Sequence, residues 1–149
     1  MLVVEEIQID KPKASVWSAI TDIDKCQHML SSILKINVLH KPSNGIVGLK
    51  WEETREMFGK EAMETMWITD AKLNEYYCTR AESHGSVYLT KLDLTQTGQG
   101  TSLTMSFNGI PQTFVAQVFV FLMGPVMRNS IKKALRKDLE DIKVFVEQN

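Results

Sequence analysis

Cysteine is scarce in this chain of 149 residues, where only Cys26 and Cys78 occur. They form no CxxC pair, and two cysteines do not make a disulfide framework in a chain of this length. Reduced, buried thiols are typical of cytoplasmic proteins, and we expect that location here. The first residues, MLVVEEIQIDK, lack the basic segment and the long apolar segment of a secretory signal, which favours the same expectation.

An excess of charge of either sign is also absent. Seventeen basic and 18 acidic residues give a net charge of −1, so no global field attracts nucleic acid, and we expect no nucleic-acid partner. The basic residues within 132–137 are offset by Asp138, Glu140 and Asp141. This pattern is typical of a solvated helix face.

Familiar catalytic and cofactor motifs are missing too. His28, His40 and His84 are scattered, and no HExxH pattern accompanies them. There is no GxSxG motif, and the glycines at 98–100 precede a predicted strand rather than a helix, unlike those of a phosphate-binding loop. We therefore expect no metal ion and no cofactor.

No repeat, low-complexity tract or linker divides the chain, and its length is typical of a single domain, 1–149. One long apolar run is present at 110–127 (IPQTFVAQVFVFLMGPVM), and the sequence becomes amphipathic after Gly124-Pro125. The run is near the minimum length for crossing a bilayer, but polar residues and the proline interrupt it. We predict that it covers an apolar cavity as a lid, and transient contact with a membrane surface stays open.

Alternating and helical periodicities divide the chain into elements. Strand formers at 2–9 are followed by two short helical segments, near 12–23 and 24–32. Ile33–His40 alternates, with Leu34, Ile36 and Val38 on one face. Five further strands are predicted near 46–57, 61–70, 75–83, 86–95 and 101–108, and the closing helix begins near Thr113.

This order of elements predicts an α+β fold. Consecutive strands joined by short turns pair antiparallel, since parallel pairing needs long crossovers. A curved sheet of about seven strands, with the long C-terminal helix across its concave face, buries every apolar surface at once. The helix carries one apolar stripe for this contact, formed by Ile131, Leu135, Leu139, Ile142 and Val146.

Three segments resemble a known superfamily. They are KPKASVWSAITDI after the first strand, GLKWEETREMFGKEAMETMWIT in the central hairpin and SIKKALRKDLEDIK in the last helix. With the order of elements, they are similar to the START-like superfamily, also called SRPBCC or helix-grip fold. It includes birch-pollen-allergen-like proteins, lipid-transfer domains and polyketide cyclase/dehydrase-like proteins. The resemblance implies a cavity between sheet and helix that holds an apolar or amphipathic molecule, but function does not follow from the fold.

The hairpin at 46–70 contains the clearest polar signal. On its first strand Trp51, Glu53 and Arg55 share one face. If this face is interior, the guanidinium lies between Glu53 and Glu64 and meets a polar group of the ligand. With the opposite parity these charges form a salt bridge on a solvated face. Both alternatives stay open.

The register of the same hairpin is also open. A turn that closes on Phe58-Gly59 makes Arg55 and Glu64 diagonal neighbours. A turn that closes on Gly59-Lys60 places them directly opposite each other.

Apolar side chains supply the rest of the predicted site. Strand parity and helical spacing direct them toward the cavity, and the eight methionines favour an adaptable pocket. The predicted ligand-binding residues are Trp51, Glu53, Arg55, Glu64, Met66, Tyr88, Met105, Phe107, Phe114, Val118 and Phe121.

Three functions fit this sequence. The first is binding or transport of a hydrophobic or amphipathic molecule such as a lipid, quinone, isoprenoid or polyketide-like compound, with Gly124-Pro125 as a hinge. The second is a cyclase- or dehydratase-type enzyme in which Glu53 or Glu64 is the base and Tyr88 the proton donor. The third is a homodimer or partner-binding module that buries 110–123. The absence of a catalytic signature favours the first.

Overall fold

The computed structural model describes residues 1–57 and 59–149. Within them, seven strands form one antiparallel sheet in the order β1-β7-β6-β5-β4-β3-β2. β2 to β7 follow one another as a meander, and β1 joins the sheet by pairing with β7. The strands are β1 (Leu2–Ile9), β2 (Ile33–His40), β3 (Lys50–Met57), β4 (Lys60–Lys72), β5 (Tyr76–Ser83), β6 (Ser86–Thr97) and β7 (Gly100–Pro111).

The helices occupy two places in the chain. Between β1 and β2 lie α1 (Lys13–Thr21), the 3-10 turn η1 (Ile23–Lys25) and α2 (Cys26–Met29), and α3 (Phe114–Gln148) follows β7. Thr113 caps α3, because its hydroxyl accepts a hydrogen bond from the Ala116 amide at 3.2 Å. This architecture confirms the predicted α+β helix-grip fold.

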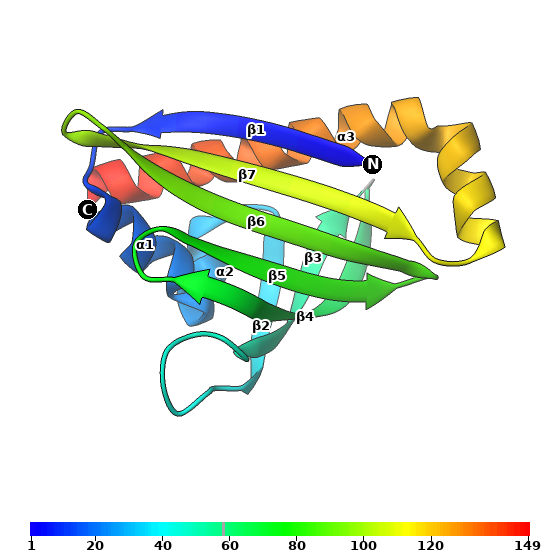
Figure 1. Cartoon of the computed structure of the whole chain (residues 1–149), viewed down its shortest axis with the longest axis horizontal. Helices are drawn as coiled ribbons and strands as arrows, with labels where there is room; N and C mark the ends of the chain where they lie inside the picture. Colours follow the sequence, from blue (N-terminus) through cyan, green and yellow to red (C-terminus); the bar gives the residue numbers. More distant parts are fainter. Residues whose placement is uncertain (58) are drawn as a thin grey trace.

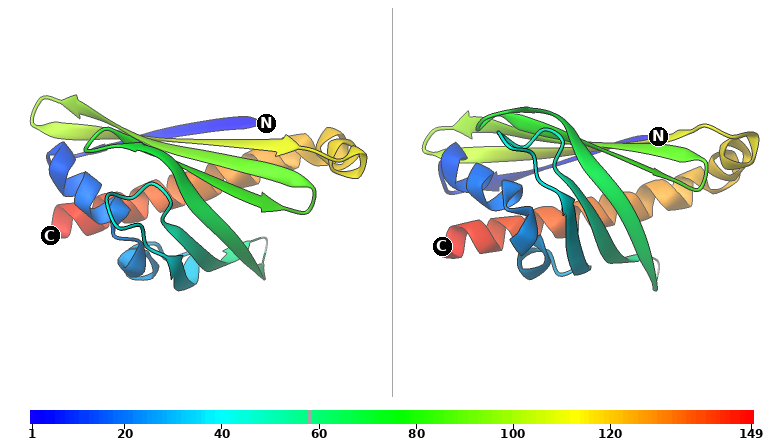
Figure 2. Two further views of the ribbon diagram at one scale, coloured as in Figure 1. Left: turned by 60° about the horizontal axis from the view of Figure 1, so that its bottom comes forward. Right: turned by 90° about the horizontal axis from the view of Figure 1, so that it is seen from below.

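The sheet is strongly curved around α3. β1, β7, β6 and β5 run side by side, and β4, β3 and β2 turn across them (Figures 1 and 2). β4 carries a bulge between Ile68 and Asp70, and a bulge increases the local twist of a strand. The sheet therefore has a concave side, on which the C-terminal part of α3 lies.

The C-terminal half of α3 supplies the centre of the core. Leu139 and Ile142 are at most 2 % exposed and belong to one cluster with Ile9 of β1 and Leu103 of β7. α1 adds Trp17, which packs edge to face on Tyr77. The predicted apolar stripe of the last helix lies in this cluster, because its spacing matches the face that α3 turns to the sheet.

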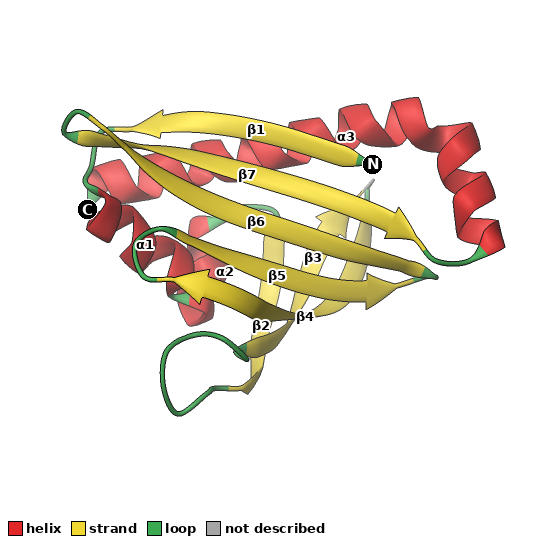
Figure 3. Cartoon of the chain, viewed as in Figure 1, coloured by secondary structure: helices red, strands yellow, loops and turns green. Residues whose placement is uncertain are grey.

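The first turns of α3 differ from the predicted lid. α3 remains helical through Pro125 but bends sharply, and its beginning extends past the end of the sheet (Figures 1 and 3). A proline inside a helix removes one hydrogen bond and bends it. We call residues 114–126 the arm. Phe114 is 78 % exposed and Phe121 84 %, so the prediction that this segment covers the cavity is wrong.

The structure of β2 also differs from the prediction, in the position of one side chain. The sequence predicts Leu34, Ile36 and Val38 on one face, yet Leu34 is exposed while Ile33 is buried. The pairing of β2 with β3 shifts between Ile33 and Lys35. Such an irregularity breaks the alternation of faces, so Leu34 points away from the core that Ile36 and Val38 contact.

Candidate functional site

A pocket of about 730 Å³ lies between the concave side of the sheet and the C-terminal half of α3. Its volume is within the range typical of sites for small organic ligands. The wall is mainly apolar, and it includes side chains from α1, η1, α2, the six strands β2 to β7 and α3. Among them are Ile23, Met29, Trp51, Met66, Leu92 and Ile142. Exposed side chains of the β3–β4 hairpin and of α3, such as Glu56, Lys133 and Lys137, form the rim.

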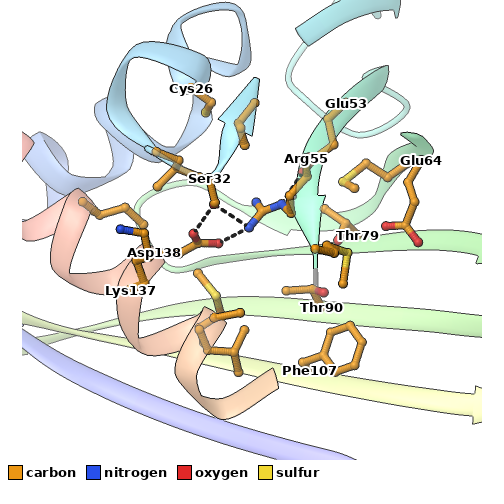
Figure 4. Close-up of a pocket in the computed structure, with 18 of the residues that line it drawn as sticks. Cys26, Ser32, Glu53, Arg55, Glu64, Thr79, Thr90, Phe107, Lys137 and Asp138 are labelled. Atoms are coloured by element: carbon orange, nitrogen blue, oxygen red, sulfur yellow. Dashed lines mark hydrogen bonds and ion pairs between the residues drawn. The ribbon is translucent and has the colours of Figure 1, made fainter. Parts of the chain in front are cut away.

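One cluster of charges interrupts the apolar wall. Arg55 donates from Nε to Glu53 at 3.0 Å and from Nη1 to Asp138 at 2.8 Å. Nη1 also donates to the hydroxyl of Ser32 at 3.0 Å, and this hydroxyl donates to Asp138 at 2.9 Å. Figure 4 shows Arg55, Ser32 and Asp138 converging on one side of the pocket. The cluster therefore joins β3, the α2–β2 connection and α3 at one point.

In this cluster every carboxylate oxygen already accepts one hydrogen bond, whereas one nitrogen of the guanidinium donates none to the described residues. Glu53 accepts from Trp51 Nε1 at one oxygen and from Arg55 at the other. Each oxygen of Asp138 likewise accepts one hydrogen bond. Arg55 Nη2 donates to none of the described residues, although the guanidinium lines the pocket. A ligand would thus meet a hydrogen-bond donor here.

Two carboxylates, Asp138 and Glu53, stabilise the positive charge of the Arg55 guanidinium. Burial lowers the pKa of Arg55, but the charges of Asp138 and Glu53 outweigh it and hold that pKa above its ordinary value. One cation between two carboxylates gives the cluster a net charge of −1. The two carboxylate side chains are 8 % exposed and Arg55 20 %, so this charge is only partly screened by water.

The hairpin adopts the first of the two registers considered above. Glu53 pairs with Glu64, and Arg55 pairs with Ala62; Phe58, which that turn includes, lies outside the described residues. The predicted arrangement of Arg55 between Glu53 and Glu64 is wrong, since Asp138 is the second carboxylate. Burial, together with the charge of Glu53, raises the pKa of Glu64 above its ordinary value.

The pocket wall brings together seven of the predicted ligand-binding residues. These are Trp51, Glu53, Arg55, Glu64, Met66, Met105 and Phe107. The face of the hairpin that was open on sequence grounds is therefore the one that faces the pocket. Whether these side chains contact a ligand stays a prediction.

Four predicted residues lie elsewhere. Tyr88 lies two residues before Thr90 on β6 and stacks on Phe107, but unlike these two residues it does not line the pocket. Phe114, Val118 and Phe121 belong to the arm and are 41 % exposed or more. Strand parity and helical spacing assign these side chains to a face, but they do not say where along the face the pocket ends.

Asp138 is the main residue that sequence reasoning missed. It was grouped with the solvated charges of the last helix, yet it is 6 % exposed. Its position gave one usable signal: it lies three residues after Leu135 and four before Ile142, hence on the same helix face as the apolar stripe. Ser32, Thr79 and Thr90 also line the pocket without a distinctive sequence pattern.

Two other ionisable groups of the wall are held neutral. Burial, with the charge of Glu53, raises the pKa of the Cys26 thiol to about 12, so it is not a thiolate nucleophile at neutral pH. Burial also raises the pKa of Tyr77, whose hydroxyl donates to the carbonyl of Ile20. Cys26 and Cys78 form no disulfide. Among residues 1–57 and 59–149, no cluster of three His, Cys, Asp or Glu side chains is arranged to hold a metal ion.

The sequence of the chain matches a known family, described as polyketide cyclase/dehydrase and lipid transport, over residues 2–147. The chain belongs to this family. This match confirms the predicted resemblance to the START-like superfamily. No curated protein has a matching sequence.

Solved structures share the fold of this family member. A START superfamily protein from Mycobacterium smegmatis has a TM-score of 0.83 at 14 % identity, covering 99 % of this chain and 97 % of its own. Ara h 8.0201 gives 0.73 at 14 % identity, with 100 % and 99 % covered. The di-domain ARO/CYC protein StfQ of the steffimycin biosynthetic pathway gives 0.81 at 9 % identity, with 99 % and 51 % covered. At these identities the similarity shows the fold alone.

Proposed function

We propose that the protein binds or transports a hydrophobic or amphipathic small molecule, such as a lipid, quinone, isoprenoid or polyketide-like compound. The observation that carries this proposal is a pocket of about 730 Å³ with a mainly apolar wall and one polar cluster. Binding sites for small molecules combine apolar contact, which supplies affinity, with a few polar groups, which fix orientation. The description of the family, which includes lipid transport, supports the same function.

The polar cluster favours a ligand whose buried end is neutral. Its net charge of −1 repels the carboxylate or phosphate of a ligand, and its free group, Arg55 Nη2, is a hydrogen-bond donor. Glu64 lies on the same wall, and burial raises its pKa, so its carboxyl is easier to protonate and then also donates a hydrogen bond. A carbonyl or hydroxyl oxygen accepts from such donors without adding charge. Lys133 and Lys137 also line the pocket, but they are exposed to water at its rim and do not offset the negative charge of the buried cluster.

This preference can be tested with four ligands that share one alkyl chain. We expect 2-dodecanone and 1-dodecanol to bind, and dodecanoate and dodecyl phosphate to bind roughly tenfold or more weakly, about 1.4 kcal/mol or more. Isothermal titration calorimetry measures the affinities, and the tryptophan fluorescence, to which Trp51 of the pocket wall contributes, is a second signal. The matched variant Asp138→Asn makes the cluster neutral and should reduce the difference between ketone and carboxylate.

The outcomes separate two claims. If none of the four compounds binds, and solvent extraction followed by mass spectrometry finds no bound molecule in the purified protein, the carrier function is wrong. If dodecanoate binds as tightly as 2-dodecanone, the pocket binds ligands but the neutral-end preference is wrong.

A cyclase- or dehydratase-type reaction is the second candidate function. Glu64 supports it, because a carboxyl group on a pocket wall whose pKa is raised by burial is a candidate for proton transfer. Glu53 is less suited, since both of its oxygens already accept hydrogen bonds, and Tyr88 lies outside the pocket. If Glu64→Gln leaves turnover of a ketone-bearing substrate unchanged, this function is wrong.

The pKa of Glu64 also predicts a pH dependence of stability. Since the folded-state pKa lies above the ordinary value of 4.5, Glu64 favours folding at pH below 4.5, and this contribution is lost as the pH rises through the folded-state pKa. We therefore expect Glu64→Gln to match the wild type in acid and to become increasingly more stable than it toward neutral pH. Urea denaturation across a pH series measures the difference.

The matched control is Glu61→Gln, which removes an exposed carboxylate from the same strand. If the two variants show the same pH dependence relative to the wild type, the burial of Glu64 is not its cause.

A further inference from the structure

The arm, residues 114–126, exposes eight large apolar side chains beyond the end of the sheet (Figures 1 and 3). Phe114, Val115 and Phe121 are 77–84 % exposed, and Leu122 is 68 % exposed. In the 18-residue apolar window of α3 only 6 % of the residues are buried. Contiguous apolar surface of this kind marks a contact site.

The apolar side chains surround much of the arm. At 3.6 residues per turn, the eight exposed apolar residues form a face that covers about 200° of the helix circumference. Phe121 lies at one edge of this face and Met123 at the other. A helix in the interfacial region of a bilayer buries its apolar face to a depth of about 5–10 Å, which approaches the helix width of about 10 Å, so an apolar face of this breadth can be covered. The shape of the apolar surface therefore favours lipid.

The small size of the arm also favours lipid over a protein partner. An arm of 13 residues is about 20 Å long and about 10 Å wide, so two paired arms cover roughly 200 Å² on each chain, far below the roughly 800 Å² per partner of a stable interface. By length and composition α3 contains an 18-residue stretch that is apolar enough to cross a membrane. Its uncharged part, 114–127, is only about 21 Å long, shorter than the roughly 30 Å hydrocarbon core, so a position within one leaflet suits it better.

Charge indicates which membrane surface is favoured. From 114 to 137 the chain has no acidic residue and five basic ones, Arg128, Lys132, Lys133, Arg136 and Lys137. Lys132 and Arg136 pair with Glu5, and the other three have no carboxylate partner among the described residues. Lys133 follows Val126 by about 10 Å along the helix, roughly one Debye length at physiological ionic strength. These charges therefore favour an anionic surface.

We propose that the arm is a membrane-docking element that lies in the interface of an anionic bilayer, with Phe121 and Leu122 inserted among the lipids. α3 also forms the rim of the pocket through Ser130 and Lys133. Docking of the arm therefore brings the rim close to the lipid surface. The surface itself lies outside the pocket, so this proposal does not depend on the nature of the ligand.

Co-sedimentation of the full chain with vesicles tests the proposal. We expect binding to vesicles of phosphatidylcholine mixed with phosphatidylglycerol, weaker binding to phosphatidylcholine alone, and a decrease with added salt. The double variant Phe121→Ser/Leu122→Ser should reduce the partition coefficient roughly tenfold or more. The matched control Leu73→Ser removes a side chain that is 73 % exposed in the β4–β5 turn, and it should bind as the wild type does.

Three results would overturn the proposal. One is the absence of binding to either vesicle. Another is equal binding by the double variant and the wild type. The third is a dimer in sedimentation velocity that the double variant converts to a monomer, without vesicle binding, which would assign the arm to a second copy of the chain. The double variant should keep its affinity for 2-dodecanone in vesicle-free buffer, so failure of docking and failure of ligand binding are distinguishable.

Discussion

Replacing Arg55 with alanine is expected to lower the free energy of unfolding by about 3 kcal/mol, near the lower end of the range for breaking a buried ion pair. The reason is that Glu53 and Asp138, each 8 % exposed, lose the cation between them. The pocket admits water to the guanidinium site, so the cost stays below the upper end. Chemical denaturation at neutral pH and low salt measures it.

The chain offers a matched control for this prediction. Arg80 pairs with Glu82 across the same two-residue spacing as Arg55 and Glu53, but the side chains of Arg80 and Glu82 are 39 % and 54 % exposed. An exposed pair of this kind contributes about 0–1 kcal/mol. If Arg80→Ala destabilises the protein as much as Arg55→Ala does, burial is not the origin of the effect.

A second variant tests the same argument from the other side. The triple change Arg55→Met, Glu53→Gln and Asp138→Asn removes all three charges together. It should recover much of the stability that Arg55→Ala loses, because no carboxylate is left buried without a partner. A triple variant less stable than Arg55→Ala would contradict this explanation.

Replacing Leu139 with alanine is expected to cost about 2–5 kcal/mol, the range for removing a fully buried leucine side chain. Leu139 is 0 % exposed and lies at the centre of the contact between α3 and the sheet. The cavity left behind adjoins the tight core at β1 and β7, which has little freedom to collapse. Thermal and urea unfolding measure the loss.

Phe121→Ala, on the same helix, is the control. Phenylalanine is larger than leucine, but Phe121 is 84 % exposed, so we expect a change within about 0.5 kcal/mol. A large loss of stability in Phe121→Ala would mean that the arm packs on the body of the protein. A small loss in Leu139→Ala would mean that α3 is not held by its apolar stripe.

Residue periodicity was sufficient to predict most of the fold. Alternation over 86–95 and 101–108 indicated strands, and the structure extends both of them. The stripe from Ile131 to Val146 predicted which face of the last helix is buried, because a helix of this composition has only one apolar side to cover. The bulge after Ile33 escaped this reasoning, since one shifted residue leaves no mark in composition.

Composition alone could not tell a lid from an exposed arm. The segment 114–126 is apolar whether it covers a cavity or projects from the molecule, and the difference depends on the direction of the bend at Pro125. Asp138 is a similar case. Its sequence neighbours are charged, and only the approach of β3 to α3 turns it from a surface carboxylate into a partner of Arg55.

The sequence by itself determined the order of the elements, the antiparallel meander and the face of α3 that packs on the sheet. For the charges of the β3–β4 hairpin it left two alternatives, an interior and a solvated position. These properties depend on contacts that are local or periodic along the chain. The tertiary structure decided which face of that hairpin lines the pocket, which carboxylate completes the cluster and where the arm lies. Those outcomes depend on residues 83 positions apart, such as Arg55 and Asp138, meeting in space, and no short-range pattern encodes such a meeting.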